Sequence, residues 1–289
     1  MFMSNFNLMS KIAPKQLPLS VYERKITPTN GIVEEGLLEH IFSVIQPKNK
    51  FCVEFGAGDG TNYSFTRNLI EQHGYSALLI EADEKLSTAL TEKYASLPKV
   101  KTIRSFLSRE NIVSLFQSAE VPAEPALICI DIDGNDYYMW QALSEYYRPD
   151  VLCIEFNSSF GPDREFVIPY REDFSWNGDD FFGASMKTMV DLGSKLGYAL
   201  IHSTSAGDNL IFVRNDHAHL FSNPKLSARE MYQLPQYGKN GRALNGKGHP
   251  ASPHTTSLME RLWYRMRYQL MAIPRKVVYA KLDPKGHRK

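Results

Sequence analysis

Long apolar runs are missing from this 289-residue sequence, and none reaches the roughly 18 residues that a membrane-spanning helix needs. The first fifteen residues, MFMSNFNLMSKIAPK, also lack the basic start and the continuous apolar stretch of a secretion signal. Cysteine is scarce, and the three cysteines lie inside apolar segments, at Cys52, Cys129 and Cys153. This pattern indicates buried reduced thiols rather than a disulfide framework or a CxxC metal site. Together these absences predict a cytoplasmic protein.

Charge of one sign is not in excess either, because 33 basic residues nearly balance 32 acidic ones and leave a net charge of +1. The end of the chain is an exception, since residues 255–289 carry nine Lys or Arg and two acidic residues. Within it, TSLMERLWYRMRYQLMAI (256–273) repeats apolar residues four apart, which predicts an amphipathic helix with a basic side. We expect this helix to pack on its own domain or on a second subunit, or to bind the inner face of an anionic membrane. No specific nucleic-acid partner is expected.

Apolar segments of strand length alternate with amphipathic segments through the middle of the chain. The expected strands are residues 51–55, 76–82, 100–105, 126–133 and 151–156. The expected helices are residues 32–45, 62–72, 84–94, 109–118, 136–146 and 184–197. Fully apolar strands separated by amphipathic helices predict an α/β fold, with a parallel sheet covered on both faces. Two further apolar runs within 198–215, joined by Ala-Gly-Asp-Asn, predict a terminal antiparallel hairpin.

The chain divides into three expected parts. Residues 1–49 form an N-terminal segment and helix, and residues 50–220 form the α/β domain. Residues 221–289 form a polar linker followed by the basic helix. Within the domain, the long aromatic loop 157–182 follows the end of a strand, where open α/β sheets bind ligands. We expect it to be a substrate lid, or else a surface insertion with a small core of its own.

The stretch VEFGAGDG, residues 53–60, indicates a ligand that passes close to the backbone, because glycine has no side chain to obstruct it. It does not match the dinucleotide pattern GxGxxG, since the sixth position is Thr61. The acids Glu54 and Asp59 would repel a pyrophosphate, and they favour the cationic cofactor S-adenosylmethionine. Glu81, at the end of the next strand, is placed to bind a ribose diol. The alternatives are a nicotinamide or flavin enzyme and a protein that lacks turnover.

VEFGAGDG resembles motif I of the class I S-adenosylmethionine-dependent methyltransferases, and the order of elements from about residue 50 to 215 is similar to theirs. Their sheet is mostly parallel, with seven strands and a terminal hairpin. Within this superfamily the chain looks most like the FkbM-type and related small-molecule or sugar O-methyltransferases. The resemblance implies a cofactor site in which each residue has a role. Glu54, Gly56, Gly58 and Asp59 would line the methionine side, Glu81 would hold the ribose, Ser105 and Phe106 would flank the adenine, and Asp131 would complete the set.

Polar residues follow two neighbouring strands, at Asp131, Asp133 and Asp136 and at Glu155 and Asn157. The ends of adjacent parallel strands meet at one edge, so these side chains should converge. One interpretation is a Mg²⁺ site formed by Asp133, Glu155 and Asn157, which would acidify an acceptor hydroxyl. A second is metal-free catalysis with Asp131 or Asp133 as general base. The third is that these acids only cap helices and loops.

His202, on the expected sixth strand, is a further catalytic candidate, although a lone histidine on a strand is more often structural. The DPPY or NPPY sequence of amino-group methyltransferases is absent, which favours an oxygen acceptor. The sequence therefore predicts transfer of a methyl group from S-adenosylmethionine to a hydroxyl of a small molecule or glycan. The alternatives are a non-catalytic or scaffold protein that retains the fold, and a nicotinamide-dependent oxidoreductase.

Overall fold

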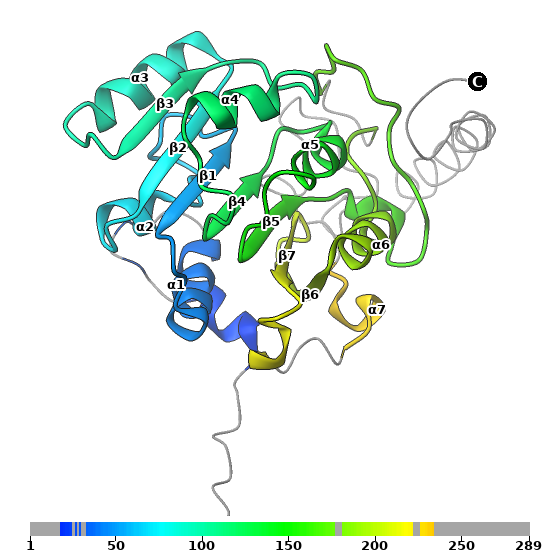
Figure 1. Cartoon of the computed structure of the whole chain (residues 1–289). Helices are drawn as coiled ribbons and strands as arrows, with labels where there is room; N and C mark the ends of the chain where they lie inside the picture. The colour runs from blue at the N-terminus through cyan, green and yellow to red at the C-terminus, as the bar shows by residue number, and fades with distance from the viewer. Residues whose placement is uncertain are drawn as a thin grey trace, which may run out of the picture.

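Seven strands form one mixed sheet in the computed structural model, which describes residues 18–24, 27, 29, 33–176, 181–221 and 226–233 (Figure 1). The strands are β1 (Phe51–Phe55), β2 (Ser76–Glu81), β3 (Val100–Arg104), β4 (Leu127–Ile130), β5 (Val151–Glu155), β6 (Tyr198–Ser203) and β7 (Asn209–Arg214). Their order across the sheet is β3-β2-β1-β4-β5-β7-β6. Strands β1 to β5 pair in parallel, whereas β7 pairs antiparallel with both β5 and β6. The predicted fold class, with its terminal hairpin, is confirmed.

The direction in which the chain adds strands reverses between β1 and β4. From β1 the chain builds outward to β2 and β3, and it then crosses over to β4 and continues to β5. At such a reversal the connections leave in opposite directions and open a crevice beyond the carboxyl ends of the strands. The glycine-rich turn that follows β1 lies at this point.

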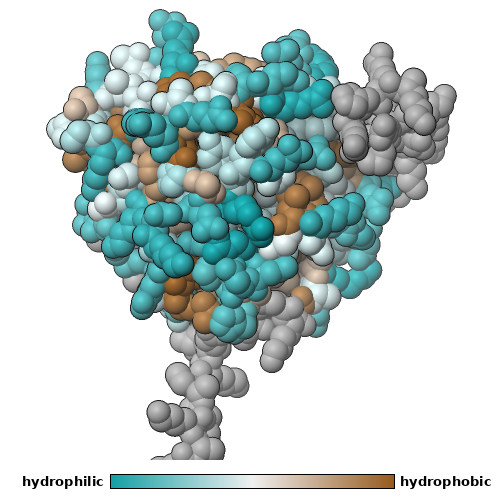
Figure 2. All heavy atoms as spheres, in the orientation of Figure 1, coloured by the Kyte–Doolittle hydropathy of each residue, from teal (hydrophilic) through white to brown (hydrophobic). Residues whose placement is uncertain are grey.

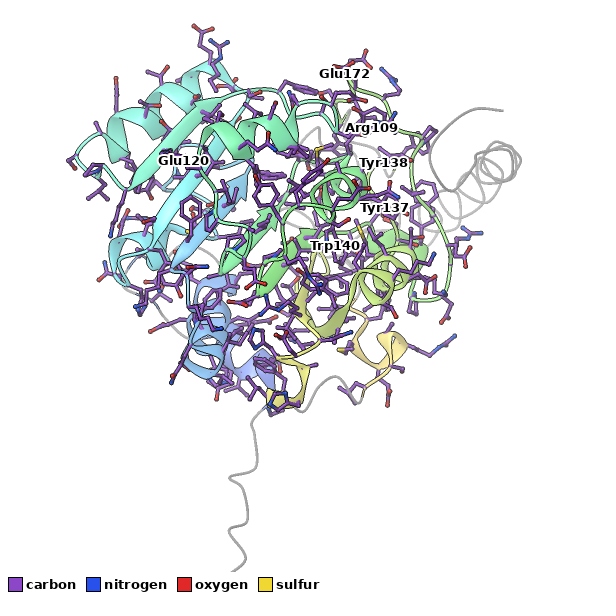
Figure 3. The ribbon with its side chains drawn as sticks, viewed as in Figure 1. Arg109, Glu120, Tyr137, Tyr138, Trp140 and Glu172 are labelled. Atoms are coloured by element: carbon purple, nitrogen blue, oxygen red, sulfur yellow. The ribbon has the colours of Figure 1, made fainter. Side chains whose placement is uncertain are left out.

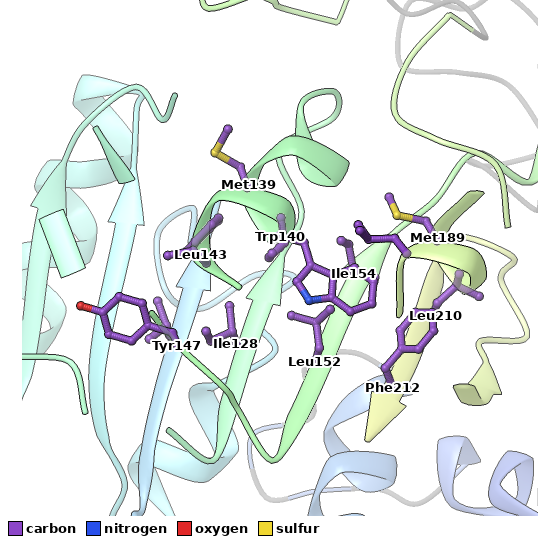
Figure 4. Close-up of a cluster of buried hydrophobic side chains, with 14 of the residues drawn as sticks. Ile128, Met139, Trp140, Leu143, Tyr147, Leu152, Ile154, Met189, Leu210 and Phe212 are labelled. Carbon is purple, nitrogen blue, oxygen red and sulfur yellow. The ribbon is translucent and has the colours of Figure 1, made fainter. Parts of the chain in front are cut away.

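Helices cover both faces of the sheet, as the apolar strands predict. The helices are α1 (Val33–Ile45), α2 (Arg67–Glu71), α3 (Glu84–Tyr94), α4 (Ile112–Ser118), α5 (Asp136–Leu143), α6 (Met186–Leu196) and α7 (Ala228–Met231). Three 3₁₀ helices accompany them: η1 (Leu19–Arg24), η2 (Ser158–Phe160) and η3 (Ala218–Leu220). One core joins α4, α5 and α6 to one face of the sheet, and Figure 4 shows Trp140 there among Leu152, Ile154 and Phe212. A second core joins α1, α2 and α3 to the opposite face.

Successive residues of each strand alternate between these two cores. In β1, Val53 and Phe55 belong to the α5 side, and Cys52 belongs to the α1 side. All three cysteines are buried free thiols on the α1 side, as predicted. This alternation determines which of the last residues of each strand has its side chain on the side of the sheet that α1 covers.

Three expectations for secondary structure were wrong in detail. The helix expected over residues 62–72 begins only at Arg67, because acidic side chains hold the preceding residues in a turn. The irregular N-terminal segment contains η1. The polar linker contains α7, which begins with a capping box between Ser227 and Glu230 and buries Met231. The basic amphipathic helix expected over 256–273 lies outside the described residues.

Within the part of the chain that the structure describes, no helix is both long enough and apolar enough to cross a membrane. On the face in Figure 2, hydrophilic residues predominate, and hydrophobic residues form separate small patches between them.

Candidate functional site

A row of polar residues crosses the carboxyl edge of the sheet on the side covered by α1. Cys129 in β4 pairs with Cys153 in β5, so two residues further on Asp131 lies level with Glu155. Glu155 in turn pairs with Asn209 in β7. On the other side of β4 lies β1, in which Phe55 pairs with Ile80 of β2. The next residue of each strand, Gly56 and Glu81, is therefore level with the other. The row therefore runs Glu81, Gly56, Asp131, Glu155, Asn209.

Gly56 is the one position of this row without a side chain, and the structure requires it. Its φ is +67°, in the left-handed region, and a Cβ added there would lie 2.3 Å from the backbone oxygen of Asp131. The turn also contacts β2, because the N–H of Gly58 donates to Oε2 of Glu81 at 2.8 Å. The glycine turn is thus held between the ends of β2 and β4, at the crevice where the chain reverses direction.

Glu81 is nearly buried, and each of its oxygens accepts one backbone hydrogen bond. Gly58 N donates to Oε2 and Asp83 N donates to Oε1, both at 2.8 Å. A carboxylate oxygen has two lone pairs, so each oxygen retains capacity for a further donor such as a hydroxyl. The predicted contact with a ribose diol is compatible with this geometry and stays a prediction.

Glu54 is held by the turn that follows the glycines. It lies two residues before Gly56, on the same side of β1, and is 1% exposed. Its carboxylate accepts hydrogen bonds from Ser64, Phe65 and Thr66. Burial raises the pKa of this carboxyl to about 7, although the hydrogen bonds oppose the rise. Glu54 therefore shapes the turn that follows the glycines, and its predicted place on the methionine side stays a prediction.

Asp59 also orders the turn. Its Oδ1 accepts from the N–H groups of Thr61 and Asn62 at 2.8 and 2.9 Å, and its Oδ2 accepts from the side chain of Asn62. The hydrogen bond from the Asn62 backbone is the main reason that the pKa of Asp59 is lowered. Its predicted contact with a cofactor stays a prediction.

The two residues expected beside an adenine follow the end of β3. The backbone N–H of Ser105 donates to the carbonyl of Glu81 at 3.1 Å, which attaches this segment to the end of the row at Glu81. The neighbouring Phe106 is 49% exposed, which is unusual for a large apolar side chain. An exposed aromatic ring offers a face for stacking, and the assignment of both residues stays a prediction.

Asp131, Asp133 and Glu155 come together as predicted. One oxygen of each carboxylate lies within 4.8 Å of the other two. Burial raises the pKa of Asp131 and of Glu155 well above the usual range, and the neighbouring carboxylates raise both further. Oε2 of Glu155 is buried and has no hydrogen-bond partner among the described residues. A buried carboxylate oxygen in this state calls for a proton, a cation or a ligand donor.

Asp136 is different, because it fits the capping interpretation. Its two oxygens accept from the N–H groups of Ile132 and Gly134 at 3.0 and 2.8 Å. Burial raises its pKa to about 7. The alternative that these acids serve only the loops therefore holds for Asp136 and does not account for Glu155.

Asn157 was predicted as a metal ligand together with Glu155. Strand β5 ends at Glu155, and Asn157 is the N-cap residue of η2, which follows. The Asn157 Nδ2 donates to the carbonyl of Phe182 at 3.0 Å, and its Oδ1 accepts from Ser159 N at 3.1 Å. Asp131, Asp133 and Glu155 are the carboxylates that come together, and the metal contact of Asn157 stays a prediction.

His202 was predicted as a catalytic candidate, but it is 7% exposed and committed to another contact. Its Nε2 lies 2.6 Å from Oε1 of Glu23, in η1. His202 pairs with Ile211, which is two residues further along β7 than Asn209. His202 therefore lies further from the carboxyl edge of the sheet than the row does. It connects the N-terminal segment to the terminal hairpin, which is the structural role that the sequence left open.

The expected lid is described over residues 157–176 and 181–182. It has a small core of its own, with Phe160, Phe166 and Ile168 at its centre. It also lies against the loop beyond β3 and against α5, where Figure 3 shows Arg109 and Tyr138. The hydroxyl of Tyr138 donates to the Ile168 carbonyl at 2.7 Å, and the guanidinium of Arg109 lies 4.1 Å from the ring centre of Tyr170. The small core agrees with the expected surface insertion, and the role of a substrate lid stays a prediction.

Sequence reasoning missed Asn209, Asp208 and Glu34. Asn209 belongs to the row because β7 is antiparallel, so the first residue of β7 lies at the edge where the parallel strands end. The Asp-Asn pair in the hairpin connection was the available signal. Glu34, in the first turn of α1, is 3% exposed and receives a hydrogen bond from Asn209 at 3.4 Å. No local pattern distinguishes it from an ordinary acid at a helix start.

No family model and no curated protein matches the sequence. Among solved structures, the N-terminal domain of EvdMO1 with SAH bound is similar over 63% of this chain and 80% of that chain, at 10% identity and a TM-score of 0.42. The CMeT domain of the citrinin polyketide synthase is similar over 68% and 55%, at 14% identity and a TM-score of 0.41. Precorrin-6y C5,15-methyltransferase from Geobacter metallireducens GS-15 is similar over 61% and 85%, at 10% identity and a TM-score of 0.35. Likeness at these identities concerns the fold alone, a seven-stranded Rossmann-like sheet with a terminal hairpin.

Proposed function

We propose that the protein transfers a methyl group from S-adenosylmethionine to a hydroxyl of a small molecule or glycan. The observation that carries this proposal is the row at the switch point, in which Glu81, the gap at Gly56 and Asp131 follow one another. Glu81 would hold the ribose, the cofactor would cross the turn at Gly56, and its reactive end would face the acid cluster.

The charge and geometry of the crevice argue against a dinucleotide. A pyrophosphate is bound by the N-terminal amides of a helix that starts within the glycine turn. Here α2 starts only at Arg67, and it is five residues long. The row beside the turn carries carboxylates at Glu81, Asp131 and Glu155, which repel phosphates and attract a sulfonium.

Within this proposal Asp131 or Asp133 accepts the proton of the acceptor hydroxyl. The hydroxyl oxygen would then be the nucleophile for the methyl group that the bound cofactor would supply. The pKa of Asp131 is raised well above its usual range, which makes its ionised form a stronger base than an ordinary aspartate. The pKa of Asp133 is raised in the same direction, although its side chain is exposed to solvent. The cofactor, when bound, supplies the methyl group, and these residues position the acceptor and take its proton.

A Mg²⁺ ion is the second way to activate the hydroxyl, and Asp131, Asp133 and Glu155 would hold it. The unpartnered Oε2 of Glu155 fits a hard cation that prefers oxygen ligands. The ion would stabilise the alkoxide and leave the carboxylates ionised. Turnover that EDTA leaves unchanged excludes this ion and leaves the metal-free base.

We also propose that residues 157–182 select the acceptor. Their attachment to Tyr138 and to Asn135, which donates to the Arg171 carbonyl at 2.7 Å, puts them beside the loop that carries Asp133. The basic C-terminal helix stays a proposed contact with a second subunit or with the inner face of a membrane, in an otherwise cytoplasmic protein.

Isothermal titration calorimetry with S-adenosylhomocysteine tests the proposed function. We expect the protein to bind it, and we expect Glu81→Ala to abolish binding by removing the ribose contact. The control is Glu92→Ala, which removes an exposed carboxylate of α3. A melting curve for each variant separates loss of the ligand contact from loss of the turn that Glu81 holds. If the unmodified protein shows no binding, the enzyme proposal fails and a scaffold protein becomes the better interpretation.

A further inference from the structure

The polar row continues past the acid cluster to Asn209, and α1 covers this end of it. Asn209 is 3% exposed. Its Nδ2 donates to Oε1 of Glu34, and its Oδ1 is buried without a hydrogen-bond partner in the described part of the chain. Glu155, its cross-strand partner on the same side of the sheet, has a buried oxygen in the same state. Two buried acceptor oxygens without a hydrogen-bond partner in the described residues, Oε2 of Glu155 and Oδ1 of Asn209, are thus on neighbouring residues beneath α1.

Two more carboxylates face this place. Glu34 is 3% exposed, and burial followed by the charge of Asp208 raises its pKa to about 8. The Asp208 carboxylate accepts from the hydroxyl of Thr204 at 2.6 Å, and its charge also acts on Glu155 and Asp131. The carboxylate of Glu23 raises the pKa of Glu34 further, and His202 is held by that same Glu23. The strongest charge effects on Glu34 and Glu155 therefore come from other carboxylates.

A buried group of carboxylates and unpaired acceptor oxygens is complementary to a hydrogen-bond donor that carries positive charge. A protonated amine has three N–H donors and no acceptor, so it can pair with several of these oxygens at once. A hydroxyl has one donor and no charge. We propose that Glu34, Asp208, Asn209 and Glu155 form a subsite for the protonated amino group of the methyl acceptor. This inference rests on the proposed function and narrows it to an acceptor with both a hydroxyl and an amine, such as an amino sugar.

The spacing of the strands would allow one acceptor molecule to reach both the proposed base and the proposed amine subsite. Glu155 and Asn209 lie in β5 and β7, and Asp131 directly follows the adjacent β4; neighbouring strands are about 4.8 Å apart. The proposed base at Asp131 and the end of the subsite at Asn209 are therefore separated by about 10 Å of backbone, which the side chains reduce. A monosaccharide can reach from one to the other.

Two probes that differ in one group test the inference: D-glucosamine, which carries an ammonium, and D-glucose, which has a hydroxyl in its place. Each is titrated into the full chain, with and without S-adenosylhomocysteine, and the affinity is measured by NMR. We expect D-glucosamine to bind at least about tenfold tighter than D-glucose, the factor expected for one charge-assisted hydrogen bond. Glu34→Gln and Asp208→Asn should each remove most of this preference. Asp216→Asn, which changes an exposed carboxylate just past the other end of β7, should leave it unchanged.

Three results overturn the inference. Equal binding of the two probes means that the subsite does not select an amine. Weaker binding of S-adenosylhomocysteine itself by Glu34→Gln and Asp208→Asn, in variants with unchanged melting curves, assigns the carboxylates to the cofactor. Displacement of D-glucosamine by equimolar Mg²⁺ assigns them to a metal. If S-adenosylhomocysteine does not bind the unmodified protein, the proposed function fails on its own, and the two sugars still report on the subsite.

Discussion

At the scale of single residues, two glycines with similar backbone angles have very different surroundings. Gly56 has a φ of +67°, and Gly74 has a φ of +74°. A Cβ at Gly56 would collide with the carbonyl oxygen of Asp131 at 2.3 Å, whereas a Cβ at Gly74 would meet only the end of the Lys99 side chain at 3.6 Å. The backbone angle makes both glycines favourable, and only at Gly56 does a neighbouring strand make glycine indispensable.

We expect Gly56→Ala to lower the free energy of unfolding by about 3 kcal/mol or more, because the clash is with backbone that cannot move aside. It should also abolish binding of S-adenosylhomocysteine. Gly74→Ala is the matched control and should cost about 1 kcal/mol, for the left-handed angle alone, with binding retained. Urea unfolding and calorimetry measure both quantities. Equal costs for the two variants would contradict a special role for the contact with Asp131.

At the scale of elements, the N-terminal segment and the terminal hairpin are joined by buried polar contacts. Glu23 and His202 are 179 residues apart in sequence, and their side chains meet at 2.6 Å. The N–H of Ser205 donates to the same oxygen of Glu23 at 3.0 Å. Burial alone would raise the pKa of Glu23, but the bonds from His202 and Ser205 outweigh it and leave the pKa lowered. These contacts attach η1 to the hairpin of β6 and β7.

A double-mutant cycle of Glu23→Ala and His202→Ala should give a coupling energy of about 2 kcal/mol, because each single change leaves the other polar group buried and unpaired. The pair Glu39 and His73, at 3.6 Å and partly exposed, is the control and should give roughly 0.5 kcal/mol or less. Urea unfolding measures both cycles. A coupling near zero for the buried pair, with methyl transfer lost in His202→Ala, would instead restore His202 as a catalytic residue.

At the scale of the whole molecule, the crevice gives the protein an unusual dependence on pH. Burial raises the pKa of Glu54 and Asp136 to about 7 and that of Glu34 to about 8. Between about pH 4.5 and 8 the folded protein therefore binds protons that the unfolded chain has released. Carboxyls with a lowered pKa, such as Asp59, make folding stability rise with pH instead, and they do so only at pH values below the ordinary pKa of a carboxyl. Folding stability should thus fall as pH rises through the neutral range.

We expect the melting temperature to fall by roughly 5 °C or more between about pH 5.5 and 8, since a change of about 1 kcal/mol shifts it by about 2–4 °C in a protein of this size. Glu34→Gln should flatten the upper part of this profile, because it removes a group that ionises there. Glu92→Gln, at an exposed site on α3, should leave the profile unchanged. Differential scanning calorimetry across the range measures it. A melting temperature that stays constant or rises would refute the buried, protonated state of these carboxyls.

Much of the fold and part of the site follow from local patterns. The apolar segments and their spacing predicted β1 to β5 and the hairpin, because strands buried on both faces need continuous apolar residues. The ends of those segments predicted that Glu81 closes β2 and that Asp131, Asp133 and Glu155 meet, because parallel strands end at one edge. The same periodicity did not indicate that the Asn157 side chain would hydrogen-bond to Phe182 and Ser159, because those contacts depend on the path of the loop after β5.

The sequence by itself determined the order of strands and helices, the glycine turn and the acids at the strand ends, since each depends on residues close together in the chain. Only the tertiary structure decided what those residues contact. It directed Glu54 to the turn over residues 64–66, joined His202 to Glu23, and brought Glu34 to Asn209 across the antiparallel strand. These contacts join residues that are distant in sequence, and burial then shifts the carboxyl groups away from their ordinary pKa values, which no local pattern can express.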